Sequence, residues 1–90
     1  MRQLSLLWYD YVPDIMDRRG PYREGHLGLL TRMHEAGECI MAGALGDPPH
    51  AGVLVFRDAQ ATQRFVDQDP YISAGLVTGH RIEPWTVPVG

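Results

Sequence analysis

The order of the apolar patterns along this chain limits its fold more than any other feature of the sequence. Four segments alternate apolar side chains in the manner of strands, and two repeat them every three or four residues, as amphipathic helices do. Gly37 ends the first helix pattern and Asp58 caps the second. The order β-α-β-β-α-β within a single domain, residues 1–90, is therefore predicted. The strand patterns lie at 4–11, 39–44, 52–56 and 76–85, and the helix patterns lie at 21–36 and 59–68.

This order is typical of an α+β fold, the ferredoxin-like split βαβ unit, in which two helices cover one face of a four-stranded sheet. The first strand is nevertheless apolar on both faces. Leu4, Leu6 and Trp8 lie on one side, and Leu7 and Tyr9 lie on the other. An uncovered apolar face of about several hundred Å² is unfavourable in a monomer. We therefore expect a homodimer in which two sheets face each other and form a dimeric α+β barrel.

Composition excludes several kinds of partner. The eight basic residues are all arginine, eleven acidic residues outnumber them, and no basic stripe follows any one segment. Nucleic acid and anionic membrane surfaces are therefore not expected as partners. No apolar run approaches the roughly 18 residues of a membrane-spanning helix. Asp10 also interrupts the first apolar segment before it reaches the length of a signal peptide, so the sequence predicts a cytoplasmic location.

Two polar residues lie where apolar residues are expected. His26 is on the apolar face of the first helix, and Asp10 is at the end of the first strand on the same face as Trp8. A β-α unit brings the end of its strand and the start of its helix to one edge of the sheet, so we expect Asp10 to contact His26. The carboxylate would fix the imidazole tautomer, and the free ring nitrogen would exchange protons near neutral pH. The alternative is a pair that only satisfies two polar groups in the core.

Arg23 is one helical turn before His26, where it could hold an anionic substrate group beside that base. No phosphate-binding loop, dinucleotide fingerprint or nucleophile elbow is present, so no cofactor is expected. His34 lies two turns beyond His26 and cannot share a metal ion with it, and no metal site is expected. Cys39 is the single cysteine and is interpreted as a small apolar residue of a buried strand.

Several short motifs occur in order along nearly the whole chain, and together they resemble the YciI-like (YCII-related) family. Arg-x-x-His together with Asp-Pro-Tyr-x-x-Ala-Gly is moderately specific, whereas either half alone would not be. The matching segments are Tyr9-Asp10, residues 19–27, residues 42–47, Asp69-Pro70-Tyr71, residues 74–76 and Pro84-Trp85.

The resemblance implies a dimeric α+β barrel with a site centred on a His/Asp pair, which His26 and Asp10 match here. It also implies a small enzyme. One branch of the family is a dehydrochlorinase acting on a chlorinated hydroxyquinol, and related barrels include muconolactone isomerases and cofactor-free monooxygenases. Asp69 and Tyr71 belong to the matching motif, although by position Asp69 is a helix cap and Tyr71 could pack in the core or the dimer interface. Asp47 is on a proline-rich loop, where it either contacts a ligand or stays in solvent.

Three functions remain open at this point. The first is a cofactor-independent enzyme that performs elimination, isomerisation or proton abstraction on a small aromatic, quinone-like or anionic substrate. In it His26 is the acid or base, Asp10 orients His26, and Arg23, Asp47, Asp69 and Tyr71 help to bind substrate. The second is a small-molecule-binding or accessory module without chemistry. The third is a structural interaction domain, which would have no internal cavity.

Overall fold

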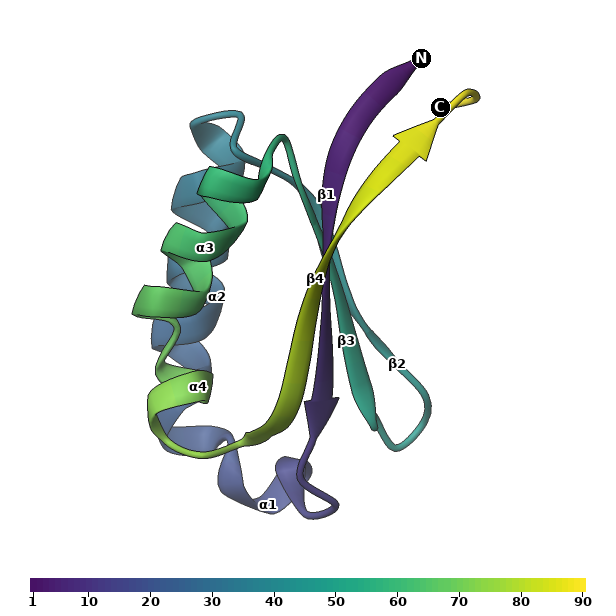
Figure 1. Cartoon of the computed structure of the whole chain (residues 1–90). Coiled ribbons are helices and arrows are strands. Elements are labelled where there is room, and N and C mark those ends of the chain that lie inside the picture. Colours follow the sequence, from purple (N-terminus) through teal and green to yellow (C-terminus); the bar gives the residue numbers. More distant parts are fainter.

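The helices that follow residue 19 lie on one side of a single sheet, and the short helix at residues 15–18 lies at one end of it (Figure 1). The computed structural model describes residues 1–90. Neighbouring strands are antiparallel in the order β2-β3-β1-β4, which confirms the predicted α+β, ferredoxin-like arrangement. The strands are β1 (Arg2–Tyr11), β2 (Cys39–Leu45), β3 (Ala51–Phe56) and β4 (Val77–Val87), and the helices are α1 (Ile15–Arg18), α2 (Gly20–Glu35), α3 (Ala59–Gln68) and α4 (Pro70–Ser73).

The core lies between the helices and the face of the sheet that they cover. Leu7 and Tyr9 of β1, Leu54 and Phe56 of β3, and Phe65 of α3 are all buried there. Burying a large apolar side chain contributes about 1.5–3 kcal/mol, so these residues hold the two layers together. Alternation along β1 places every second side chain in this layer, as the period-2 pattern predicts.

Helix α1 is an element that the sequence did not predict, because four residues are too few to show a helical period. The segment after β1 reads as a polar connection. In the structure Ile15 of α1 is buried against Val12, Tyr71 and Leu76, and these residues form a second, smaller core cluster. This cluster fixes the chain between β1 and α2 at the end of the sheet where Tyr11 lies.

Strand β2 is less buried than its apolar sequence suggested. We interpreted it as apolar on both faces, but within one chain only Cys39 is buried and the residues from Met41 to Leu45 are exposed. The cause is its position, because β2 is at the edge of the sheet and α2 does not close over it. A hollow therefore remains between α2 and β2.

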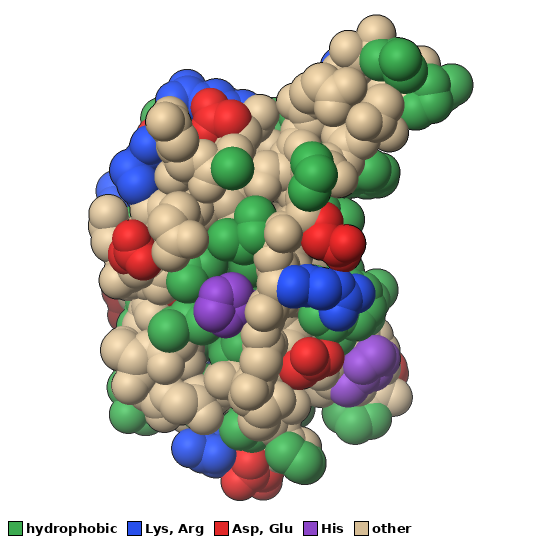
Figure 2. Space-filling view, in the orientation of Figure 1, with side chains coloured by type: hydrophobic (Ala, Val, Ile, Leu, Met, Phe, Trp, Pro, Cys, Tyr) green, Lys and Arg blue, Asp and Glu red, His purple; other side chains and the backbone are tan.

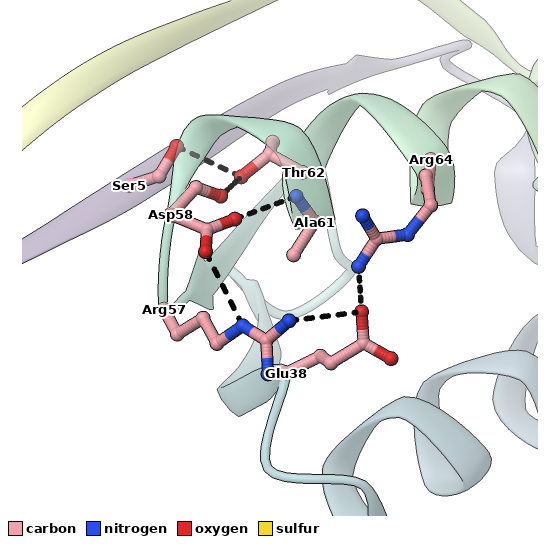
Figure 3. Close-up of polar contacts among 7 residues, drawn as sticks. All are labelled: Ser5, Glu38, Arg57, Asp58, Ala61, Thr62 and Arg64. Atoms are coloured by element: carbon pink, nitrogen blue, oxygen red, sulfur yellow. Dashed lines mark hydrogen bonds and ion pairs between the residues drawn. The ribbon is translucent and has the colours of Figure 1, made fainter.

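Helix α3 is joined to its neighbours at its first turn (Figure 3). Asp58 caps the helix by accepting a hydrogen bond from the Ala61 backbone N–H at 2.8 Å, as predicted. Thr62 donates to the Ser5 hydroxyl of β1 at 2.8 Å, which satisfies two buried hydroxyl groups. Figure 3 also shows Glu38, which precedes β2, between the guanidinium groups of Arg57 and Arg64. These contacts connect α3 with the central strand and with the start of β2.

The opposite face of the sheet has no helix over it (Figure 1). Leu6 and Trp8 are half-buried on this open face, while Met41 and Trp85 are 65% and 42% exposed. Figure 2 shows hydrophobic side chains along this side of the sheet, interrupted by charged ones. The predicted apolar second face of β1 is therefore present and uncovered within one chain. None of the four helices has the length and apolar character that crossing a membrane requires.

Candidate functional site

His26 lies on the buried side of α2 and is 5% exposed. Its Nδ1 is 2.8 Å from an Asp69 carboxylate oxygen, although the two residues are 43 positions apart in the sequence. The contact forms because α2 and α4 pack side by side at Gly25, where an added Cβ would lie only 3.3 Å from the Pro70 side chain. A glycine one residue before the histidine thus lets the two helices approach closely enough for the pair to form.

Asp69 joins α3 to α4 and is almost completely buried. Its side chain caps α4 by accepting from the Tyr71 backbone N–H at 3.1 Å. The same oxygen meets Nδ1 of His26, and the other oxygen accepts from the Tyr9 hydroxyl at 2.7 Å. A carboxylate accepts all three bonds, so Nδ1 of His26 is the donor in this contact, and in the neutral imidazole Nε2 then has a free lone pair.

Aromatic rings fix the plane of the His26 imidazole. The Tyr71 ring stacks on it with 3.7 Å between centroids and an angle of 2° between planes, and Phe65 meets it edge-on at 5.8 Å. Nε2 has no hydrogen-bond partner within the protein, and it is not among the enclosed polar atoms. The imidazole is therefore held in one orientation with one nitrogen available to a ligand.

A cavity of about 250 Å³ opens beside His26, between the start of α2 and the edge strand β2. Two arginines, Arg19 and Arg23, border it one helical turn apart, and no acidic residue does. Neither arginine forms an ion pair with another residue of the chain. The cavity therefore combines a positive charge with a histidine, as a site for an anionic ligand requires. Its lining is completed by Tyr11, Ile15, Leu27, Leu30, Ala42, Gly43, Ala44, Leu54 and Tyr71.

The chain matches the YCII-related domain over residues 4–86. It belongs to this family. Protein YciI from Escherichia coli O6:H1 (strain CFT073) is 29% identical over 93 residues, which cover 91% of this chain and 95% of that protein. An uncharacterized protein of Haemophilus influenzae is 28% identical over 85 residues, which cover 82% of this chain and 87% of that protein.

Solved structures with the same fold include two proteins with a stated chemistry. One is 5-chloro-2-hydroxyhydroquinone dehydrochlorinase from Burkholderia phenoliruptrix AC1100, in complex with 2,5-dihydroxybenzoquinone. It has a TM-score of 0.74 and 20% identity, and the match covers 92% of this chain and 93% of that one. The other is a cofactor-independent oxygenase from Streptomyces nogalater, with a TM-score of 0.59, 12% identity and coverage of 100% and 97%. These likenesses establish the fold of the YCII-related chain.

The structure corrects the partner expected for His26. Asp10 is exposed on the open face of the sheet, where it accepts a hydrogen bond from the Trp8 indole N–H at 2.9 Å. The expectation that strand end and helix start share one edge of the sheet holds, but Asp10 and His26 lie on opposite faces. The reason is strand alternation, because Tyr9 and Tyr11 point toward the helices and Asp10 points away from them.

The other predicted site residues of this YCII-related chain separate into two groups. Arg23 and Tyr71 border the cavity, and Asp69 contacts His26 in addition to capping α4. Asp47 lies on the exposed turn between β2 and β3 and does not border the cavity. His34 lies outside this site, and its Nδ1 is 2.9 Å from the backbone carbonyl oxygen of Cys39. No group of three or more potential metal ligands is arranged to hold an ion.

Three residues of this region were not identified from the sequence: Tyr9, Tyr11 and Arg19. Tyr9 and Tyr11 read as core residues of a strand, and nothing local distinguishes a tyrosine that binds a carboxylate from one that only packs. Arg19 had a usable signal, since it is four residues before Arg23 and this spacing places both on one side of a helix.

The two tyrosines of β1 have raised pKa values. Burial, reinforced by the neighbouring Tyr71 and Asp69 and opposed by Arg19 and Arg23, raises the pKa of Tyr11 to about 12. Burial also raises the pKa of Tyr9, and the Asp69 carboxylate reinforces this effect. Both hydroxyls therefore remain protonated throughout the neutral range.

These shifts predict a loss of stability at alkaline pH. An unfolded tyrosine releases its proton near pH ~10, whereas Tyr11 in the folded chain holds it until about pH 12. The unfolded state therefore binds fewer protons in this window, and the free energy of unfolding falls by up to about 1.4 kcal/mol per pH unit for each such group. Urea unfolding at a series of pH values should show this decline, and Tyr11→Phe should reduce its slope. Tyr22→Phe, on the exposed side of α2, is the control, and an unchanged slope in Tyr11→Phe would contradict the assignment.

Proposed function

We propose that this YCII-related protein is a cofactor-independent enzyme that moves a proton on a small anionic or phenolic ring compound, with His26 as the acid or base. The observation that supports this proposal most strongly is the set of contacts that the His26 imidazole makes. Asp69 holds Nδ1, Tyr71 fixes the ring plane, and Nε2 is available at a cavity that contains two arginines. Asp69 takes the orienting role that the sequence had suggested for Asp10.

The division of labour follows from the contacts. Arg23 and Arg19 attract a negatively charged substrate oxygen, and Nε2 of His26 removes a proton from the bound molecule. The resulting imidazolium lies against the Asp69 carboxylate, which stabilises its positive charge. The proton then returns to another atom of the substrate, as in an isomerisation, or a leaving group departs, as in an elimination.

Size and relatedness support the same substrate class. A cavity of about 250 Å³ suits a single substituted ring better than a large ligand. A dehydrochlorinase of the same fold binds 2,5-dihydroxybenzoquinone, and another protein of this fold is a cofactor-independent oxygenase. Hydroxyquinols, hydroxyquinones and related cyclic enols are therefore the compounds that we would test first.

Solvent deuterium exchange tests the proposal without requiring the natural product. Hydroxyquinols, hydroxyquinones and enolisable cyclic ketones are incubated with the protein in deuterium oxide, and loss of each carbon-bound proton is followed by NMR. We expect catalysed exchange at one carbon of at least one compound. Compounds that bind but never exchange or turn over would instead favour the binding module without chemistry.

We also propose that a second copy of the chain covers the open face of the sheet and completes an α+β barrel. The support is the exposure of Met41 and Trp85 beside the half-buried Leu6 and Trp8 on a face that no helix covers. The charged groups of this face are partly matched already, because Arg81 lies 4.8 Å above the Trp8 ring and pairs with Glu83. Such a face can be buried without leaving these charges unpaired.

Replacing an apolar residue of this open face with a charged one should separate the two copies. We expect the wild-type protein to have twice the mass of one chain in sedimentation or light-scattering measurements, and Trp85→Glu to shift it toward a single chain. Trp85 is 42% exposed, so the substitution should leave the fold of each chain intact. Tyr22→Glu, which changes a 39% exposed aromatic residue on the helical side, should remain dimeric. A wild-type protein that stays a single chain at high concentration would contradict the proposal.

A further inference from the structure

Two tyrosine hydroxyls at the cavity have no hydrogen-bond partner within the protein. The Tyr71 hydroxyl is the one enclosed side-chain polar atom of the chain that lacks a partner, and Tyr71 is 2% exposed. The Tyr11 hydroxyl makes no side-chain hydrogen bond either, although Tyr11 borders the same cavity. A buried hydroxyl without a partner is unfavourable, and such a group calls for a functional explanation.

The backbone of β3 makes room for the Tyr11 hydroxyl. A Cβ added at Gly52 would lie 2.6 Å from this oxygen, so any side chain at position 52 would displace it. The Tyr11 ring meets the Tyr71 ring edge-on, with 6.3 Å between centroids. Tyr71 in turn stacks on His26, so the two rings and the imidazole border one space.

The charges around this space favour a ligand oxygen that bears negative charge. Arg19 and Arg23 are both close enough to Tyr11 to lower its pKa, against the larger effect of burial. Because the net pKa of Tyr11 is about 12, its hydroxyl stays neutral and can donate a hydrogen bond. Two arginines and the side chains of Tyr11 and Tyr71 therefore border the cavity, and no acidic residue does.

We propose that the Tyr11 and Tyr71 hydroxyls, with Arg19 and Arg23, bind the substrate oxygen that becomes negatively charged when His26 removes a proton. This inference rests on the proposed function and specifies its substrate as a carbonyl compound with a hydrogen on an adjacent saturated carbon, such as an enolisable cyclic ketone. His26 Nε2 takes the proton, the electron pair of the C–H bond forms a carbon–carbon double bond, and the carbonyl π pair moves to oxygen. The oxygen of the resulting enolate accepts from the tyrosines.

One carboxylate positions both the base and a donor. Asp69 accepts from Nδ1 of His26 and, through the same oxygen, from the backbone N–H of Tyr71. The Tyr71 ring lies parallel to the imidazole at 3.7 Å, so its hydroxyl and Nε2 are carried by two stacked rings with fixed separation. Donors that need no rearrangement when charge develops give the strongest stabilisation of such an oxygen.

Binding of 4-nitrophenol tests the subsite without turnover, because its anion has a separate visible absorption band. At a pH below the pKa of the free probe, we expect the wild-type protein to bind the anion and to increase this band. Tyr11→Phe and Tyr71→Phe should each weaken binding of the anion about tenfold, as expected for a hydrogen bond to a charged group. Affinity for 4-nitroanisole, which cannot ionise, should stay within about twofold in both variants.

Controls separate binding from folding. Tyr22→Phe removes an exposed hydroxyl and should bind the probe like the wild type. Tyr71→Phe should not lower the melting temperature, because the hydroxyl it removes has no partner in the protein. A lowered melting temperature would mean that the fold uses this hydroxyl, which would overturn its assignment to a ligand. Absence of the anion band with wild-type protein, or wild-type affinity for the anion in both Phe variants, would overturn the subsite.

The subsite and the proposed function fail differently. If His26→Gln leaves solvent exchange unchanged while Tyr11→Phe and Tyr71→Phe still weaken binding of 4-nitrophenolate, the base assignment is wrong and the oxygen subsite stands. If His26→Gln abolishes exchange while both Phe variants bind the anion like the wild type, the base assignment stands and the subsite is overturned. If His26→Gln leaves exchange unchanged and both Phe variants bind the anion like the wild type, the base assignment and the subsite are both overturned.

Discussion

Replacing His26 with glutamine is expected to lower the rate of solvent deuterium exchange about 100- to 10,000-fold, the usual contribution of a general acid or base. Glutamine can still accept a hydrogen bond near the cavity, but its amide does not take up a proton at neutral pH. The Asp69 carboxylate and the two arginines remain in place. The loss should therefore appear in the rate of the bound complex more than in the affinity for ligand, which is measured separately by equilibrium titration.

His50→Gln is the matched control for this experiment. His50 is exposed on the connection between β2 and β3 and does not border the cavity, so its replacement should leave exchange within about twofold of the wild type. Melting curves of both variants show whether each is folded. A folded His26→Gln protein with wild-type exchange would remove the base from the proposed mechanism and would leave the cavity as a binding site.

The arrangement of strands and helices was predictable because each element carries a local signal. The two periodicities distinguish strands from helices, Gly37 and Asp58 mark helix ends, and the resulting β-α-β-β-α-β order has a recognised fold. The edge position of β2 was not predictable in the same way. Its residues are as apolar as those of a central strand, and only the sheet order shows that one side of it lacks cover.

The candidate site was predictable only in part, because the sequence does not reveal which face of β1 the helices cover. Both faces are apolar, so Asp10 at the strand end was as good a partner for His26 as any residue on the other face. The actual partner, Asp69, was hidden by its own local role. A helix cap already explains an aspartate before a proline, and its contact with His26 joins residues 43 positions apart. A long-range contact of this kind leaves no periodic pattern.

Asp69→Ala is expected to cost about 3–5 kcal/mol of unfolding free energy, because two buried donors lose their acceptor at about 1–3 kcal/mol each and a helix cap is lost. The substitution leaves the Tyr9 hydroxyl and Nδ1 of His26 without their acceptor and removes the cap of α4. A domain of this kind has a total stability of about 5–15 kcal/mol, so the loss is a large share of it. Urea unfolding measures the change. Asp67→Ala, at an exposed position of α3, is the control, and its free energy of unfolding should stay within about 0.5 kcal/mol of the wild type.

Asp69→Asn should separate the structural role of this carboxylate from its role in proton transfer. The oxygen that contacts His26 also accepts from the Tyr71 backbone N–H, a group that can only donate a hydrogen bond. The amide oxygen must therefore keep this place, and the amide nitrogen must face Tyr9, whose hydroxyl can rotate to accept from it.

Because the tautomer of His26 is then unchanged, the Asn variant should lose much less stability than the Ala variant. What it lacks is the negative charge beside the imidazolium that forms when His26 takes up a proton. Solvent exchange should fall about tenfold or more while the fold persists. Wild-type exchange in Asp69→Asn would show that the charge has no part in the reaction and that Asp69 only holds the ring in place.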